Sequence, residues 1–437
     1  MNTETHLEVF IPHEREGKYF TLPFDMPPHT ASVTITYTYE RDPTDTIPAE
    51  HGTFTPRTNV NTIDLGLIAP DGSQVGASGS NKRRVTISAT SATPGYTPHP
   101  LNLGQWQILV GAYKVAQDGV TVTYDLAFTP EELRLYKGDL HTHTLASDGV
   151  LTVAELAVHA RRHGLDFLAI TDHNQMVSTV ALPHIPDMTL IPGIEWTHYL
   201  GHATFLGSDR FYDEPFFTHS EEEARARFAS ARERGAVIVI AHPFEEPYAF
   251  KFDMESLSFD CLEVWNGPMR ESNLRAVSYW LELLAAGKKV PITGGSDYHR
   301  DGLFQIVGGP CMGVYAMSDS PEALLSAVRE GHSFVTYAPD GPIVEMTCDG
   351  AILGDSVAWR PGLTMHIRVD GLKRGDVVKL VSDRGSRDVH SASSAGTLEL
   401  ELPVETPGFA VVQVWRTFLP SVPPLPALLS NPIYFDG

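Results

Sequence analysis

The alternation of apolar and polar positions divides the 437-residue chain into three parts. Between residues 18 and 129, apolar side chains recur at every second position, as in Val33, Ile35 and Tyr37, and clusters of Pro, Gly, Asn and Ser separate the runs. This period of two, without helical signals, predicts the strands of a β-sandwich. The same pattern returns between residues 341 and 437. We therefore expect an N-terminal β-sandwich over residues 1–130 and a C-terminal sandwich-like domain over residues 339–437.

The central part, residues 131–338, has a different pattern, in which short apolar runs alternate with helix signals. Capping residues predict helices over 152–164, 220–235, 272–287 and 320–331, each closed by a glycine. Seven runs are largely non-alternating, as in strands buried on both faces: 136–141, 165–171, 189–195, 202–207, 237–242, 259–265 and 290–296. This alternation predicts a parallel sheet or barrel with its chemistry at the carboxyl ends of the strands.

Metal-ligating residue types recur at the ends of these runs. His141 and His143 are two residues apart, so a strand presents both on one face, and Asp148 follows in a Ser-Asp-Gly turn. The other candidates lie at the remaining strand ends: His173, Glu195, His202, His242, Asp297 and His299. Burying so many ionisable groups without a metal is costly. Imidazole and carboxylate ligands without thiolate suit Mn, Zn or Fe, and we expect Asp172 to orient a ligand histidine.

Composition narrows the possible partners and locations. The net charge of −22 and the pI near 5.2 argue against a nucleic-acid polymer. Bound cations would still attract a small anionic substrate. The N-terminal segment has no apolar signal core and no run reaches transmembrane length, so we expect a cytoplasmic protein that does not enter a membrane. The sequence leaves the oligomeric state open.

Five motifs resemble those of one family, the PHP (polymerase and histidinol phosphatase) metal-dependent hydrolases. They are Gly-Asp-Leu-His-Thr-His-Thr with Ser-Asp-Gly (138–149), Thr-Asp-His-Asn (171–174), Gly-Ile-Glu-Trp (193–196), Ala-His-Pro (241–243) and Gly-Ser-Asp-Tyr-His (295–299). Glu-Val-Trp-Asn (263–266) and the spacing from Glu195 to His202 resemble the carbaryl-hydrolase branch of that superfamily. The resemblance implies an α/β fold, a distorted (β/α)7 barrel between the two sandwiches, which holds two or three divalent ions.

The family pattern also implies how the ligands are shared. A first metal would take His141, His143, Asp297 and a shared Glu195; a second Asp148, His173 and His299; a third Glu195, His202 and His242, where His198 could replace His202.

These residues predict a hydrolase in which a hydroxide bridging two metal ions attacks the substrate. The resemblance to the PHP hydrolases implies a small phosphomonoester or phosphodiester as the favoured substrate. The resemblance to the carbaryl-hydrolase branch implies a carboxyl or carbamate ester as the alternative, and a non-catalytic binding protein with structural metals is the second alternative. Candidates for contacts with the substrate or leaving group are His198, Tyr248, Arg270, Arg300 and His332.

Overall fold

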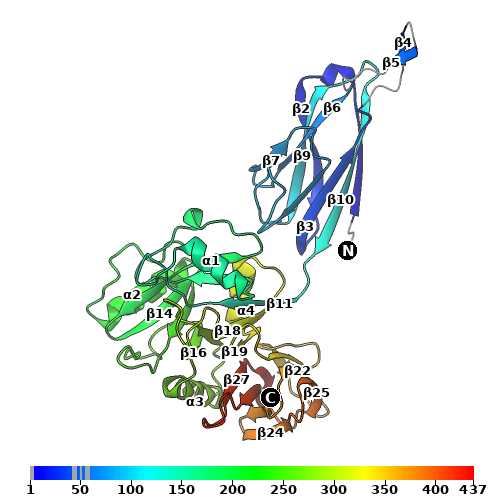
Figure 1. The fold of residues 1–437 in the computed structure, drawn as a ribbon. Coiled ribbons are helices and arrows are strands. Elements are labelled where there is room, and N and C mark those ends of the chain that lie inside the picture. The colour runs from blue at the N-terminus through cyan, green and yellow to red at the C-terminus, as the bar shows by residue number, and fades with distance from the viewer. Residues whose placement is uncertain (1–3, 42–46, 50–51, 55–59) are drawn as a thin grey trace. The chain divides into compact units, whose positions relative to one another are not determined.

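The computed structural model describes residues 4–41, 47–49, 52–54 and 60–437. The chain forms two compact units, Met1–Glu132 and Leu133–Gly437 (Figure 1). The expected boundary near residue 338 lies inside the second unit, and the division into three domains stays a prediction.

The N-terminal unit, drawn in blue to cyan in Figure 1, consists of two antiparallel sheets. One sheet has the order β1 (Glu4–Ile11), β10 (Val120–Pro130), β3 (Thr30–Thr38), β8 (Arg84–Ser88), and the other β2 (Lys18–Met26), β9 (Gly104–Lys114), β6 (Thr62–Ile68), β7 (Gln74–Ser78). A hairpin of β4 (Ile47–Ala49) and β5 (Gly52–Phe54) and a 3-10 turn at His13–Arg15 complete it. Alternate side chains from both sheets, such as Val33 and Trp106, share one buried core. The period of two therefore produces a sandwich.

A long mixed sheet carries the central part of the chain. Its strands run in the order β17 (Ile292–Gly295), β16 (Cys261–Asn266), β15 (Val237–Ala241), β14 (Gly201–Leu206), β13 (Thr189–His198), β12 (Phe167–Ile170), β11 (Arg134–Asp139), β18 (Cys311–Ala316), β19 (Ser333–Thr336). Each of the seven predicted runs overlaps one of the strands β11 to β17. The sequence pattern missed β18 and β19. Strand β18 pairs antiparallel with β11, and β19 pairs antiparallel with β18.

Four α-helices accompany this sheet in the described residues: α1 (Val153–Arg162), α2 (Glu221–Glu233), α3 (Glu271–Ala285) and α4 (Pro321–Glu330). A 3-10 turn covers Thr179–Ala181. Thr152 and Glu155 form the predicted capping box of α1, and Ser320 caps α4. Helix α3 begins earlier than predicted, because Arg270 occupies its N-cap and the Ser272 hydroxyl donates to Glu245 instead.

The structure does not confirm a regular (β/α)7 barrel, because the pairings around β14 are antiparallel. Only residues 199–200 connect β13 and β14, which is too short for the crossover that a parallel pair needs. Strand β14 also pairs antiparallel with β15. The central part is a mixed α/β fold with few helices and many strands.

The C-terminal strands continue this sheet. Strand β19 pairs with β27 (Leu425–Ser430), followed by β26 (Gly408–Arg416), β23 (Val377–Ser382) and β24 (Gly385–Ser391). A smaller sheet of β20 (Ile343–Thr347), β22 (Thr364–Leu372) and β25 (Gly396–Pro403) shares a core with them, and β21 (Ser356–Ala358) pairs with β28 (Ile433–Asp436). After β27, the Asn431 side chain accepts from the Ile292 N–H (2.8 Å) and donates to the Ser333 carbonyl (3.1 Å). The C-terminal strands are therefore bonded to the central sheet.

Candidate metal centre

The structure brings all nine candidate ligands together at one end of the central sheet. They form four overlapping groups, and within each group the ligand atoms lie within 4.8 Å of one another. We call this set the histidine–carboxylate cluster: His141, His143, Asp148, His173, Glu195, His202, His242, Asp297 and His299. Most of them closely follow a strand, because the sheet places the carboxyl ends of β11, β12, β15 and β17 at the same edge.

Glu195 lies at the middle of the cluster. One carboxylate oxygen, Oε1, is 2.8 Å from Nδ1 of His202 and 3.1 Å from Nε2 of His242. The other oxygen, Oε2, is 3.4 Å from Nε2 of both His141 and His143. The carboxylate is fully buried, so both of its oxygens face histidine rings and not solvent.

Asp297 and Asp148 occupy two other sides of the cluster. Asp297 Oδ1 lies 2.9 Å from Nε2 of His143 and 3.5 Å from Nε2 of His141. Asp148 Oδ1 lies 3.1 Å from Nε2 of His299 and 3.6 Å from Nε2 of His173. Asp148 is the more exposed carboxylate, so the group around it borders solvent.

Several buried nitrogen and oxygen atoms of the cluster make no hydrogen bond within the described residues, as expected of atoms that bind metal ions. Within the described residues, six buried side-chain atoms of the cluster make no hydrogen bond: Nε2 of His141, Nδ1 and Nε2 of His143, Oε2 of Glu195, Nδ1 of His242 and Oδ1 of Asp297. Several lie close together without hydrogen-bonding geometry. Leaving buried polar atoms unpaired is expensive, and nitrogen and oxygen ligands of this kind suit divalent transition metals. The cluster therefore supports divalent metal binding.

The backbone beside the cluster is strained and tightly packed. His242 (φ 28°) and Asp297 (φ 50°) both adopt the left-handed region, which costs a non-glycine residue about 1–3 kcal/mol. A Cβ on Gly295 would overlap Cβ of His141, so only glycine allows β17 to pass this close to that histidine. The strained backbone conformations therefore occur at two of the candidate ligands themselves.

Burial and mutual attraction shift the pKa values of these groups in opposite directions. Burial alone would lower the pKa of His141, but Glu263, Asp297 and Glu195 raise it well above its ordinary value. Burial would raise the pKa of Glu195, and the surrounding histidines, His141 first, hold it well below the usual range. The Glu195 carboxylate therefore stays ionised near neutral pH, as a cation ligand must.

Glu263 is a further functional candidate, which the sequence analysis named only as part of the Glu-Val-Trp-Asn motif and gave no role. Its Oε1 is 3.1 Å from Nδ1 of His141, and its Oε2 accepts the backbone N–H of His242 at 2.9 Å. The signal in the sequence was an acidic residue inside an otherwise apolar strand, β16. Such partners fix the ring orientation of ligand histidines.

Asp172 and Asp139 brace the backbone around the cluster. Asp172 accepts from the backbone and side chain of Thr144 and from the Ser147 hydroxyl, so its hydrogen bonds hold the loop before Asp148. The prediction that it orients a ligand histidine is wrong. The fully buried Asp139 accepts three backbone N–H groups, from His141, Ser296 and Gly308, and burial raises its pKa to about 6.

The candidate substrate contacts divide into two sets. Tyr248 and Arg270 line the cavity over the cluster, and Arg270 is paired with Glu245 at 2.7 Å. Arg300 is not among the described residues that line this cavity. His332 bonds to Asp355 at 3.0 Å and is not part of that lining either.

His198 lines the cavity but is not part of the cluster. Its ring stacks on Trp196 (5.2 Å between centroids), its Nδ1 accepts from the Leu200 N–H, and its Nε2–H donates to the Thr218 carbonyl. Both ring nitrogens are thus used by the backbone. His202, and not His198, joins Glu195 and His242.

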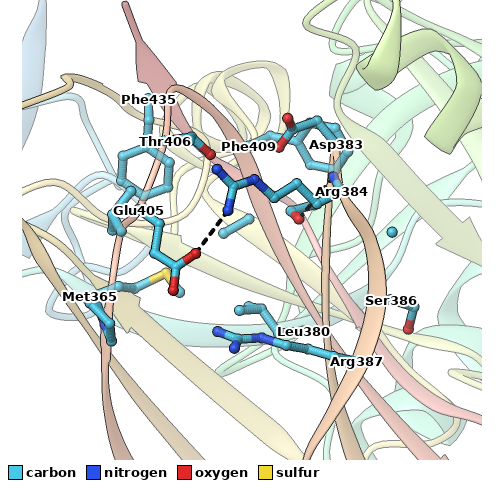
Figure 2. A pocket seen from close by; sticks show the side chains of 15 residues that line it. Met365, Leu380, Asp383, Arg384, Ser386, Arg387, Glu405, Thr406, Phe409 and Phe435 are labelled. Atoms are coloured by element: carbon cyan, nitrogen blue, oxygen red, sulfur yellow. Dashed lines mark hydrogen bonds and ion pairs between the residues drawn. The ribbon is translucent and has the colours of Figure 1, made fainter.

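Two cavities are lined by different kinds of side chain. The cavity over the cluster has a volume of 1270 Å³, and its lining combines seven of the nine cluster residues with several aromatic rings. A second hollow of 180 Å³, between β22, β23 and β26, contains the ion pair of Arg384 and Glu405 (Figure 2). The described residues that line it, all on C-terminal strands and turns, include no histidine. The candidate chemistry is therefore at the first cavity.

A mixed sheet with a buried histidine–carboxylate cluster at the carboxyl ends of its strands supports divalent metal binding. Residues 139–240 match the family model of the PHP domain. The matched residues include six of the nine members of the cluster.

Two curated relatives match parts of this chain. The 5'-3' exoribonuclease Rnm of Salmonella typhimurium is 34% identical over 110 residues, which are 22% of this chain and 36% of Rnm. The DNA polymerase/3'-5' exonuclease PolX of Bacillus subtilis is 42% identical over 53 residues, 12% of this chain and 9% of PolX. This chain therefore spans only about a third and about a tenth of the lengths of these relatives.

Solved structures give a weaker likeness. A two-domain protein of Bacteroides vulgatus, which contains a predicted PHP-like metal-dependent phosphoesterase, is 17% identical with a TM-score of 0.40, over 64% of this chain and 90% of that one. An amidohydrolase of Chromobacterium violaceum is also 17% identical, with a TM-score of 0.28, over 39% of this chain and 89% of that one.

The comparisons revise one prediction about partners. The exclusion of nucleic-acid polymers is not supported, because both curated relatives are nucleic-acid enzymes by name. None of the helices in the described residues has the length and apolar character needed to cross a bilayer.

Proposed function

We propose that this chain is a metal-dependent phosphoesterase that hydrolyses a small phosphomonoester or phosphodiester. The observation that carries the proposal is the set of six buried nitrogen and oxygen atoms, among the described residues, that make no hydrogen bond, in a cluster most of whose members lie within the residues that match the PHP domain. A closed structural site holds one metal with four ligands, whereas nine residues in four overlapping groups offer ligands for two or three.

Three proposed ligand sets, which the family resemblance implies, draw on the four overlapping groups. His141, His143 and Asp297 with Glu195 would hold one ion; Asp148, His173 and His299 a second; and Glu195, His202 and His242 a third. Bound divalent ions supply Lewis acidity and lower the pKa of water to near neutral pH. Mn, Zn and Fe all suit these ligands.

The protein's own side chains account for the rest of the chemistry. Glu263 holds the His141 ring, and Asp172 holds the loop that carries Asp148. Arg270, the one arginine or lysine among the described residues of the cavity lining, would bind an ester oxygen from its place beside Glu245. Tyr248 also lines the cavity, and we propose that its hydroxyl protonates the leaving alcohol.

Metal analysis and a substrate panel test the proposal. We expect at least two equivalents of Mn, Zn or Fe in the purified protein, and turnover of p-nitrophenyl phosphate or bis-p-nitrophenyl phosphate. Turnover of 1-naphthyl acetate or carbamate alone would favour the carboxyl or carbamate ester alternative of the carbaryl-hydrolase branch. A short RNA oligonucleotide belongs in the same panel because of the exoribonuclease relative. Full metal occupancy without turnover of any substrate would favour a binding protein.

A further inference from the structure

Four exposed aromatic side chains line the cavity over the cluster. We call them the aromatic rim: Tyr199, Phe216, Phe217 and Tyr248. Their exposures are 97%, 41%, 49% and 56%, respectively. Large apolar side chains gathered in one concave site and left open to solvent mark ligand-binding surfaces.

The rim reaches directly to the candidate metal ligands. The Tyr248 ring lies 5.6 Å from the His202 ring, centroid to centroid. A substrate atom held at the cluster would therefore have the rest of its molecule beside this ring. The cavity volume of 1270 Å³ leaves room for a group much larger than a phosphate.

The backbone on both sides of Phe217 is held in place despite the exposure of its ring. The Trp196 indole N–H donates to the Phe216 carbonyl at 2.7 Å, and His198 donates to the Thr218 carbonyl at 3.2 Å. The loop that carries Tyr248 is closed by the Phe250 N–H, which donates to the Pro243 carbonyl at 2.9 Å. A backbone held in this way keeps the attachment points of the rings in place, so a ligand loses less binding free energy in ordering these loops.

The charges around the rim do not suit a polyanion. Among the described residues, Arg270 is the only arginine or lysine that lines the cavity, and Glu245 pairs with it at 2.7 Å. A nucleic-acid strand is bound by several phosphate-contacting cations. One anionic group at the cluster, joined to an uncharged flat group at the rim, matches both the charge and the apolar surface.

We propose, on the basis of the phosphoesterase function above, that the aromatic rim binds a flat apolar group of the substrate. The substrate class is then an ester that joins one anionic centre to an aryl or similarly flat hydrophobic group. Phe217 and Tyr248 are the specificity-determining residues, and they contact this group through their ring faces.

Binding of two phosphonates to the metal-loaded protein tests the rim without requiring turnover. The probes are 1-naphthylmethylphosphonate and propylphosphonate, whose C–P bonds resist hydrolysis, and the readout is the ratio of their Kd values by titration calorimetry. We expect the naphthyl probe to bind at least about tenfold more tightly. In Phe217→Ala and Tyr248→Ala this ratio falls toward one, with propylphosphonate affinity retained.

Two further variants serve as matched controls. Tyr113→Ala removes a ring that is 72% exposed in the N-terminal unit, and it leaves the ratio unchanged. Tyr248→Phe keeps the ring and removes the hydroxyl, so the preference for the naphthyl probe persists. An equal Kd for both probes in the wild type, an unchanged ratio in either alanine variant, or loss of the preference in Tyr248→Phe would each overturn the proposal.

Phosphonate binding and phosphate ester hydrolysis, measured on the same protein, distinguish failure of this inference from failure of the proposed function. Rapid hydrolysis of phosphate esters together with equal binding of the two phosphonates would contradict the role of the aromatic rim and support the phosphoesterase function. A naphthyl preference that depends on Phe217 and Tyr248, without hydrolysis of any phosphate ester, rejects the phosphoesterase and keeps the rim as a binding site.

Discussion

Glu263 and His141 face each other in the buried interior, with Oε1 of the carboxylate 3.1 Å from Nδ1 of the ring. This contact directs the other ring nitrogen, Nε2, toward Glu195 and Asp297. The second oxygen of Glu263 accepts the backbone N–H of His242, which directly follows the neighbouring strand β15. One carboxylate thus fixes two histidines that come from different strands.

Glu263→Gln is expected to weaken divalent metal binding by about 10–100-fold, because partners of ligand histidines contribute about that much to affinity. The amide can still accept one hydrogen bond but no longer favours the His141 tautomer that presents Nε2. Competition against a chelating dye measures the affinity, with circular dichroism as the control for folding. Wild-type affinity in a folded Glu263→Gln protein would contradict this role.

Divalent metal is expected to stabilise the second unit. At a free concentration about 100 times Kd, binding adds about 2.7 kcal/mol to the free energy of unfolding. Thermal melts with Mn²⁺ or Zn²⁺, and then with excess EDTA, measure the change in Tm. His143→Ala, which removes a ligand candidate shared by two groups, should reduce the shift, whereas Tyr113→Ala should keep it. If the Tm changes neither with added metal nor with EDTA, the result would contradict a metal centre.

Asp148→Asn is expected to lower turnover by more than about 100-fold without unfolding the protein. Loss of a residue that only supports metal ligands already costs about 10–100-fold, and Asp148 faces His173 and His299 directly. Its carboxylate is more than half exposed, so neutralising it leaves the core intact. Steady-state kinetics at saturating metal, together with the Tm, check both statements. Retained activity would exclude Asp148 from the site.

Asp139 is expected to make the metal-free protein less stable as the pH rises from about 4 to about 6. Burial raises the pKa of this carboxyl to about 6 in the folded state, so folding takes up a proton in that window and stability falls as the proton is lost. A difference of about two pKa units between the folded and unfolded states corresponds to about 3 kcal/mol.

The difference in unfolding free energy between wild type and Asp139→Asn, followed across about pH 3.5 to 7 in EDTA, isolates this group from the histidines. The expected sign is a wild-type stability that declines relative to the variant as the pH rises. A flat difference would show that Asp139 titrates at its ordinary pKa.

The sequence identified the strand ends well because each candidate ligand lies at or near the end of an apolar run. It could not exclude His198 while the predicted strand stopped at Glu195. Strand β13 continues to His198, so Glu195 and Thr197 share one face and His198 lies on the other, outside the ligand groups. The stacking of the His198 ring on Trp196 agrees with this alternation.

The remaining misses have different physical causes. Strands β18 and β19 pair with each other and with β11 and β27 across long sequence separations, and nothing local specifies such partners or their antiparallel direction. The expected parallel order also failed at β14, where a two-residue turn forces an antiparallel hairpin. Glu263 was missed because an acidic residue inside an apolar strand gives no spacing signal, although its burial makes it informative.

The hydrogen bonds of Asn431 have a consequence for how the chain is made. Its amide bonds to Ile292, at the start of the strand that leads to Asp297, and to Ser333 on β19. A ribosome delivers residue 431 more than a hundred residues after Asp297. The hydrogen bonds that hold the start of this strand can therefore form only after residue 431 has been made, well after the candidate ligands themselves.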